Sequence, residues 1–133
     1  MQGMNEEERL RFTCEVIALL DSWKVKDSDQ LKLLGLPDDT RSRQIRGYRQ
    51  GSAALPDDEQ VAVYVDHMMG IADALFTSNP RNTSAGPAWM NRRNSRFKDR
   101  TPLNAMLEDG LQMVFAVRVH LDCSYDWHVD SNS

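Results

Sequence analysis

The sequence has few of the features that mark secreted, membrane or disulfide-linked proteins. Cys14 and Cys123 are the two cysteines among 133 residues, and no CxxC pattern occurs. A disulfide framework is therefore not indicated, and a reducing compartment is expected. The N-terminus lacks the basic start and apolar run of a secretory signal. No stretch approaches the ~20 apolar residues that a membrane span needs. We expect a cytoplasmic protein without a membrane partner.

Catalytic and cofactor motifs are also missing from the sequence. It contains no GxSxG motif, phosphate loop or dinucleotide fingerprint, and no Ser, His and Asp arrangement stands out. His120, Cys123 and His128 have an H-x2-C-x4-H spacing, with Asp126 nearby. A zinc site usually needs a fourth strong ligand, and these residues stand at the end of the chain. We therefore predict no enzyme activity, no cofactor and no metal site.

What the sequence does contain is helical periodicity. Apolar residues recur at helical spacing after a cap at Asn5, in a long segment that starts at Pro56, and again in residues 111–121. Thr101 is expected to cap a further helix that has Pro102 at its first position and ends at Gly110. No strand signal is present, so the predicted fold class is all-α.

Residues 27–51 have the pattern of a helix-turn-helix. A cap at Asp27 or Ser28 would start a short helix, and Gly35 would stop it. Asp38 or Asp39 would then cap a second short helix. Two short helices joined by a glycine-containing turn are typical of this DNA-binding motif.

The second of these helices collects arginine in a chain whose net charge is -4. On a helical wheel Ile45 and Tyr48 dock the helix, and Arg41 and Arg49 flank them as candidate phosphate contacts. The outward face suits a major groove, since arginine can pair with guanine and glutamine with adenine. The candidate DNA-binding residues are Thr40, Arg41, Arg43, Gln44, Arg46, Arg49 and Gln50. The alternative is an ordinary solvated face.

Gly47 lies on the same outward face. Glycine costs ~1 kcal/mol relative to alanine inside a helix. Close approach of the backbone to a partner would explain why it is present.

The polar stretch 81–88 contains glycine and proline and marks a domain boundary. We predict a DNA-binding domain at residues 1–80 and a second helical domain at residues 81–133.

Residues 88–122, "AWMNRRNSRFKDRTPLNAMLEDGLQMVFAVRVHLD", resemble the C-terminal toxin-binding domain of Xre/MbcA/ParS-type antitoxins. The features that carry the resemblance are Trp89, Asn94, Phe97, Arg100, Thr101, Pro102, Leu103 and Gly110, followed by an apolar helix. The sequence departs from the family pattern at Lys98 and Asp99, where glycine is usual, and at Ser95, where proline or another small residue is common. These departures concern the loop before Thr101.

The resemblance implies an antitoxin of a type II toxin–antitoxin system. The adjacent gene would encode a RES-domain toxin that destroys NAD, and the antitoxin would neutralise it and repress its own operon. In such families the C-terminal region approaches the toxin's active-site cleft. Two-fold operators also favour a homodimer.

The candidate toxin-binding residues fall in two groups. Basic side chains of the second domain could meet an acidic toxin patch or simply be solvated. Aromatic side chains near the chain end suit an interface, or could fold back on their own helix. The candidates are Arg92, Arg93, Arg96, Arg100, Tyr125, Trp127 and His128.

Two other functions fit the same sequence. One is a stand-alone dimeric helix-turn-helix transcription regulator with no toxin partner. The other is an interaction module whose helix-turn-helix no longer binds DNA.

Overall fold

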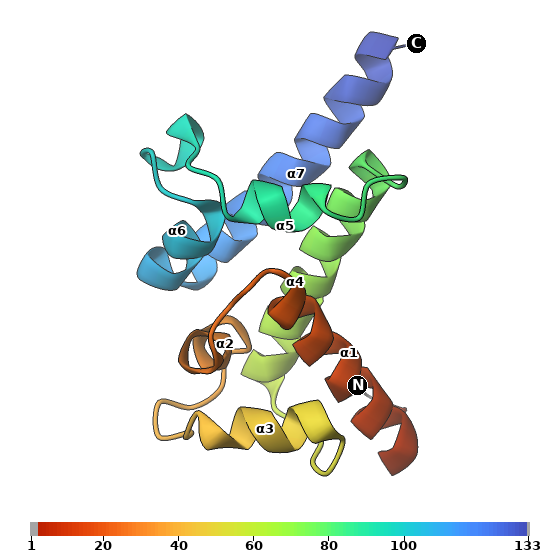
Figure 1. The fold of residues 1–133 in the computed structure, drawn as a ribbon, viewed down its shortest axis with the longest axis vertical. Coiled ribbons are helices and arrows are strands. Elements are labelled where there is room, and N and C mark those ends of the chain that lie inside the picture. The colour runs from red at the N-terminus through yellow and green to blue at the C-terminus, as the bar shows by residue number, and fades with distance from the viewer. Residues whose placement is uncertain (1–2, 133) are drawn as a thin grey trace. The chain divides into compact units, whose positions relative to one another are not determined.

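The computed structural model describes the backbone of residues 3–132 and the side chains of residues 3–123. Within this range the chain forms seven α-helices and one 3-10 helix and no strand (Figure 1). The predicted all-α fold class is confirmed. A single isolated bridge joins Asn94 to Arg100. None of the helices described is both long enough and apolar enough to cross a membrane.

The chain divides into two compact units, Met1–Asp66 and His67–Ser133. The division falls within the long helix α4 (Glu59–Ser78), whereas the predicted boundary follows that helix, after Pro80.

The first unit begins with α1 (Glu6–Ser22). The Asn5 side chain accepts a hydrogen bond from the Glu8 backbone N–H at 2.8 Å, which confirms the predicted cap. Val16, Ile17 and Leu20 are fully buried on one face of the helix. The apolar periodicity of this segment therefore predicted the helix and, at Ile17 and Leu20, its buried face.

Helix α2 (Asp27–Leu33) packs against α3 (Arg43–Gln50), and α3 packs against α1. The N-cap of α2 is Lys26, with no side-chain cap bond, so the cap predicted at Asp27 or Ser28 is wrong. Gly35 has a φ of +68° and ends the short helix as predicted. A Cβ at this position would collide with the Tyr64 ring, so the close packing of α4 also requires glycine here.

The arginine-rich helix starts later than its sequence indicates. The Thr40 N–H donates to the Pro37 carbonyl at 2.9 Å and closes a turn over Asp38 and Asp39. The Arg41 N–H donates to the Gln44 side chain at 3.1 Å. The N-cap is Ser42, so capping by Asp38 or Asp39 is wrong. Thr40 and Arg41 consequently lie on the connection before α3.

Helix α4 also starts later than predicted, at Glu59 and not at Pro56. The Asp58 carboxylate accepts a hydrogen bond from the Val61 N–H at 3.1 Å, which satisfies a free donor of the first turn. In the first unit α4 buries Val61 and Val65, and in the second unit it buries Met68 and Ile71.

The second unit continues with α5 (Ala85–Met90), the 3-10 helix η1 (Ser95–Phe97), α6 (Pro102–Asp109) and α7 (Leu111–Asn132). Half of the predicted boundary loop 81–88 is therefore helical. The Thr101 hydroxyl accepts a hydrogen bond from the Asn104 N–H at 3.0 Å, and Pro102 is the first residue of α6, both as predicted. Gly110 ends α6 with a φ of +78°, and α6 packs on α7.

Candidate functional site

Helix α3 carries five of the predicted DNA-binding residues, and all five are exposed. Ile45 is fully buried and Tyr48 is 6% exposed, so they dock the helix as the helical wheel predicted. Burial also raises the pKa of the Tyr48 hydroxyl. We call Arg43, Gln44, Arg46 and Gln50 the α3 face; Arg49 is also exposed but is bound to carboxylates of other helices.

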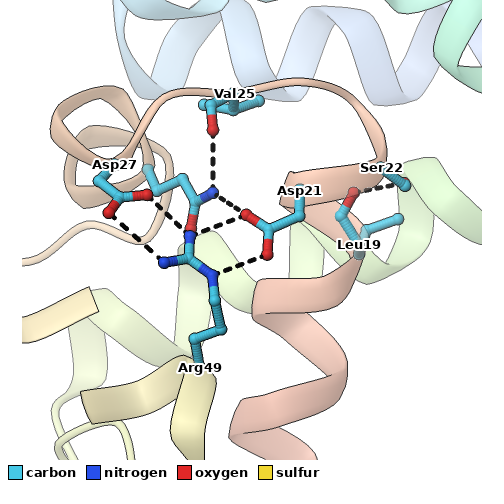
Figure 2. Close-up of polar contacts among 7 residues, drawn as sticks. Leu19, Asp21, Ser22, Val25, Asp27 and Arg49 are labelled. Carbon is cyan, nitrogen blue, oxygen red and sulfur yellow. Dashed lines mark hydrogen bonds and ion pairs between the residues drawn. The ribbon is translucent and has the colours of Figure 1, made fainter. Parts of the chain in front are cut away.

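Arg49, on the same helix, is tied to the rest of the unit. Its Nε and Nη2 atoms donate to the two carboxylate oxygens of Asp21, each at 2.9 Å, and Nη2 also donates to Asp27 Oδ1 at 2.7 Å (Figure 2). These bonds lower the pKa of the Asp21 carboxyl, and the Arg49 hydrogen bond is the main cause. Arg49 thus joins the C-terminal end of α3 to the end of α1 and the start of α2.

Gln30 extends this network into the protein. Its amide Nε2 donates to Asp21 Oδ1 at 2.7 Å and to the Val25 carbonyl at 2.9 Å, and the residue is fully buried. The predicted contact of Arg49 with DNA stays a prediction, but the geometry favours a structural role. Sequence reasoning did not find this role because Asp21 and Asp27 are remote from Arg49 in the sequence.

Gly47 is partly covered by the chain itself. The Ser52 N–H and hydroxyl both donate to the Gly47 carbonyl, at 3.0 and 3.1 Å. A Cβ on Gly47 would meet Ser52 Oγ at 3.5 Å and Ala53 Cβ at 3.8 Å, which are ordinary contacts. The loop after α3 therefore lies next to Gly47, the residue whose backbone was predicted to face a partner.

In the second unit Trp89, Phe97 and His120 form an aromatic cluster. The Trp89 ring stacks on His120 at 6.1 Å between centroids, and Phe97 meets both rings edge-on. Burial, and then the charge of Arg96, lower the pKa of His120. Trp89 and Phe97, two residues of the antitoxin-like pattern, therefore join α5 and η1 to α7.

Arg92, Arg93 and Arg96 are exposed, as expected of surface contacts. Arg100 differs from them because its guanidinium donates to Glu108 at 2.8 Å and to Asp109 at 2.9 Å. It holds the loop before Thr101 against the end of α6, and its hydrogen bond lowers the pKa of Asp109. Binding of toxin by Arg100 stays a prediction.

Lys98 and Asp99, where the antitoxin-like pattern usually has glycine, have unusual backbones. The φ values of these two residues are +59° and +63°. Glycine adopts this left-handed region most readily, and other residues pay a penalty of roughly 1–2 kcal/mol. The loop therefore has the conformation that glycine would favour at both positions.

A groove of about 950 Å³ lies between η1 and the outer face of α7. Phe115 is 57% exposed there, and Val119 is 41% exposed. Leu111, one of the apolar residues that recur at helical spacing in residues 111–121, is 39% exposed and lies off the buried stripe. Sequence reasoning did not find the groove. The lining residues are Arg96, Phe97, Gln112, Met113, Phe115, Ala116, Val119, His120 and Cys123.

The predicted contacts Tyr125, Trp127 and His128 belong to the last turns of α7, and their side chains lie outside the described residues. His128 and Asp126 of the metal-like spacing lie there too. Among the side chains that are described, no group of three or more His, Cys, Asp or Glu residues could hold a metal ion.

The fold and these surfaces define an all-helical protein with a cationic α3 face in one unit and an apolar groove in the other. The chain is 30% identical over 107 residues to the uncharacterized protein y4oB of Sinorhizobium fredii (strain NBRC 101917 / NGR234), and the match covers 78% of this chain and 76% of that protein. The chain belongs to the same family as this protein. No family model matches the chain, and no solved structure matches it.

Proposed function

We propose that this protein is the antitoxin of a type II toxin–antitoxin system. In this proposal it neutralises a RES-type, NAD-degrading toxin encoded by the adjacent gene, and it represses its own operon through the α3 face. The resemblance of residues 88–122 to Xre/MbcA/ParS-type antitoxins supports the toxin part. The exposure of the α3 face supports the DNA part.

The observation that carries DNA binding is the division of α3 into two faces. Ile45 and Tyr48 are buried, while Arg43, Arg46 and Gln50 are exposed and can approach a major groove. Gln44 is exposed as well, and its side chain accepts a hydrogen bond from the Arg41 N–H. Arginine and glutamine are the side chains that pair with guanine and adenine. Arg41, on the connection before α3, is exposed and is proposed as a phosphate contact, and the adjacent Thr40 stays among the proposed DNA-binding residues.

Toxin binding is assigned to the second unit. Arg92, Arg93 and Arg96 are exposed and suit an acidic patch on the toxin. Tyr125, Trp127 and His128 remain the proposed contacts of the chain end. The protein in this proposal acts by binding alone, with no catalytic role and no cofactor.

The DNA part is tested by Arg43→Ala with the promoter of the protein's own operon. If Arg43 reads a base, affinity should fall by ~1–3 kcal/mol and specificity should relax at one operator position. Fluorescence anisotropy at several salt concentrations measures both effects. Arg11→Ala is the matched control, because Arg11 is an exposed arginine of α1 outside the α3 face.

Two results would separate the alternatives. An equal loss of affinity for operator and random DNA would make Arg43 a phosphate contact. No binding of the unaltered protein to its promoter would remove the repressor role and leave a pure interaction module.

A further inference from the structure

The outer face of α7 is apolar and partly exposed within the described part of the chain, and the Phe115 ring on it also meets the His67 ring of α4 edge-on at 5.9 Å between centroids. Leu111, Phe115 and Val119 follow one another at intervals of four residues, so they share one side of the helix. The opposite stripe is buried and consists of Val114, Val117 and Leu121. A helix that is apolar on two faces is typical of a buried position. The outer face is therefore built to be covered.

The border of this face carries positive charge. Among the described residues that line the groove, Arg96 is the only Lys, Arg, Asp or Glu. Arg92 and Arg93 stand just before it on the same segment, and all three side chains are exposed. Phe97, Met113 and Phe115 supply the apolar lining. The surface thus suits an occupant that combines apolar residues with carboxylates.

The far end of α7 has this chemistry. Residues 119–133 contain Asp122, Asp126 and Asp130 at intervals of four and no Lys or Arg, and they also include Tyr125 and Trp127. The helical backbone continues to Asn132, and Figure 1 shows α7 running on beyond α6. Asp122, the first of the three, is exposed. The acidic C-terminal end of α7 is therefore complementary in charge to the arginines that border the groove beside its N-terminal part.

We propose that two copies of this chain pair through α7, antiparallel about a two-fold axis. The acidic end of α7 in each copy covers the groove of the other, so that each contact is made twice. The acidic end of one copy then faces Arg96 of the other, so the second copy and the toxin compete for Arg96 and for the chain end. A helix of this length spans about 33 Å, enough for an acidic end and a groove to lie side by side.

The central test is the mass of the full chain by size-exclusion chromatography with light scattering. The unaltered protein is expected at twice 15.2 kDa. Phe115→Asp should shift it to the monomer mass at micromolar concentration, because a charge then stands in the apolar groove. Phe76→Asp is the control, since Phe76 is 59% exposed, against 57% for Phe115, and does not line the groove. It should leave the dimer intact.

Charge reversal tests the pairing without altering the apolar surface. Arg96→Asp and Asp122→Arg should each weaken the dimer at least about ten-fold, and the double variant should recover most of the loss. Circular dichroism checks that each variant keeps its helices. A monomeric unaltered protein would overturn the proposal, as would a Phe115→Asp variant that stays dimeric. If that dimeric variant also fails to co-purify with the toxin, the groove belongs to the toxin instead.

Discussion

Two arginines six residues apart on α3 have different surroundings, and these separate their roles. Arg43 is exposed and free to reach a partner, whereas Arg49 binds Asp21 through two parallel hydrogen bonds and also binds Asp27. Bidentate pairs of this kind fix geometry as well as charge. Arg49 therefore sets the position of α3, and the α3 face is left to make contacts.

Arg49→Gln should lower the free energy of unfolding by roughly 1 kcal/mol. The estimate is small because the side chains of Arg49, Asp21 and Asp27 are 38%, 38% and 43% exposed and solvent screens the pairs. The loss should shrink as salt is added. Urea unfolding measures it, with Arg46→Gln as the control on the same helix. Equal losses in the two variants would show that the network does not stabilise the fold.

Gly47→Ala should stabilise the protein by about 0.5–1 kcal/mol, because alanine is the better helix former and the added Cβ meets only ordinary contacts. Operator affinity should change less than two-fold. Gly51→Ala is the contrast, since Gly51 has a φ of +79° and alanine would be strained there. If Gly47→Ala is stable but loses DNA binding, a partner approaches the backbone at that position.

At the scale of elements, local signals were predictable and distant contacts were not. Asn5 and Thr101 each cap a helix through a bond three residues away, and Gly35 stops α2 by its own backbone angle. These features depend on neighbours in the sequence. The start of α3 was missed because a turn at Pro37 competes with the cap. The Arg49 network was missed because its partners come from two other helices.

The junction of α1, α2 and α3 should weaken in acid. The pKa of Asp21 is lower in the folded protein than its ordinary value of 3.8. The stabilisation is therefore complete above pH 3.8 and is lost as the pH falls through the folded pKa. The unfolding free energy of Asp21→Asn should depend less on pH below 4 than that of the unaltered protein.

Asp57→Asn removes an exposed aspartate outside this network and serves as the control. The lowered pKa of His120 adds a separate loss of stability that begins as the pH falls below 6.5, since the unfolded chain takes up the proton first. The Asp21→Asn and Asp57→Asn variants both keep this loss of stability linked to His120. An Asp21→Asn profile that matches the unaltered protein below pH 4 would contradict the assignment.

At the scale of the molecule, the two units carry different surfaces. The first presents the α3 face, and the second presents the exposed arginines and the groove of α7. Periodicity predicted the long helices α1, α4 and α7, whereas α5 begins inside the predicted boundary loop. Periodicity did not predict the groove, because a helix with two apolar faces leaves open which face the rest of the unit covers. In the proposed function the first unit binds DNA and the second unit binds the toxin.

Co-expression with the product of the adjacent gene tests the central claim most directly. Growth, cellular NAD and co-purification are scored together. The account predicts that the neighbour alone stops growth and depletes NAD, and that this protein restores both and purifies with it. A neighbour that is harmless, or that does not bind this protein, would contradict the antitoxin role and leave a regulator that acts on DNA alone.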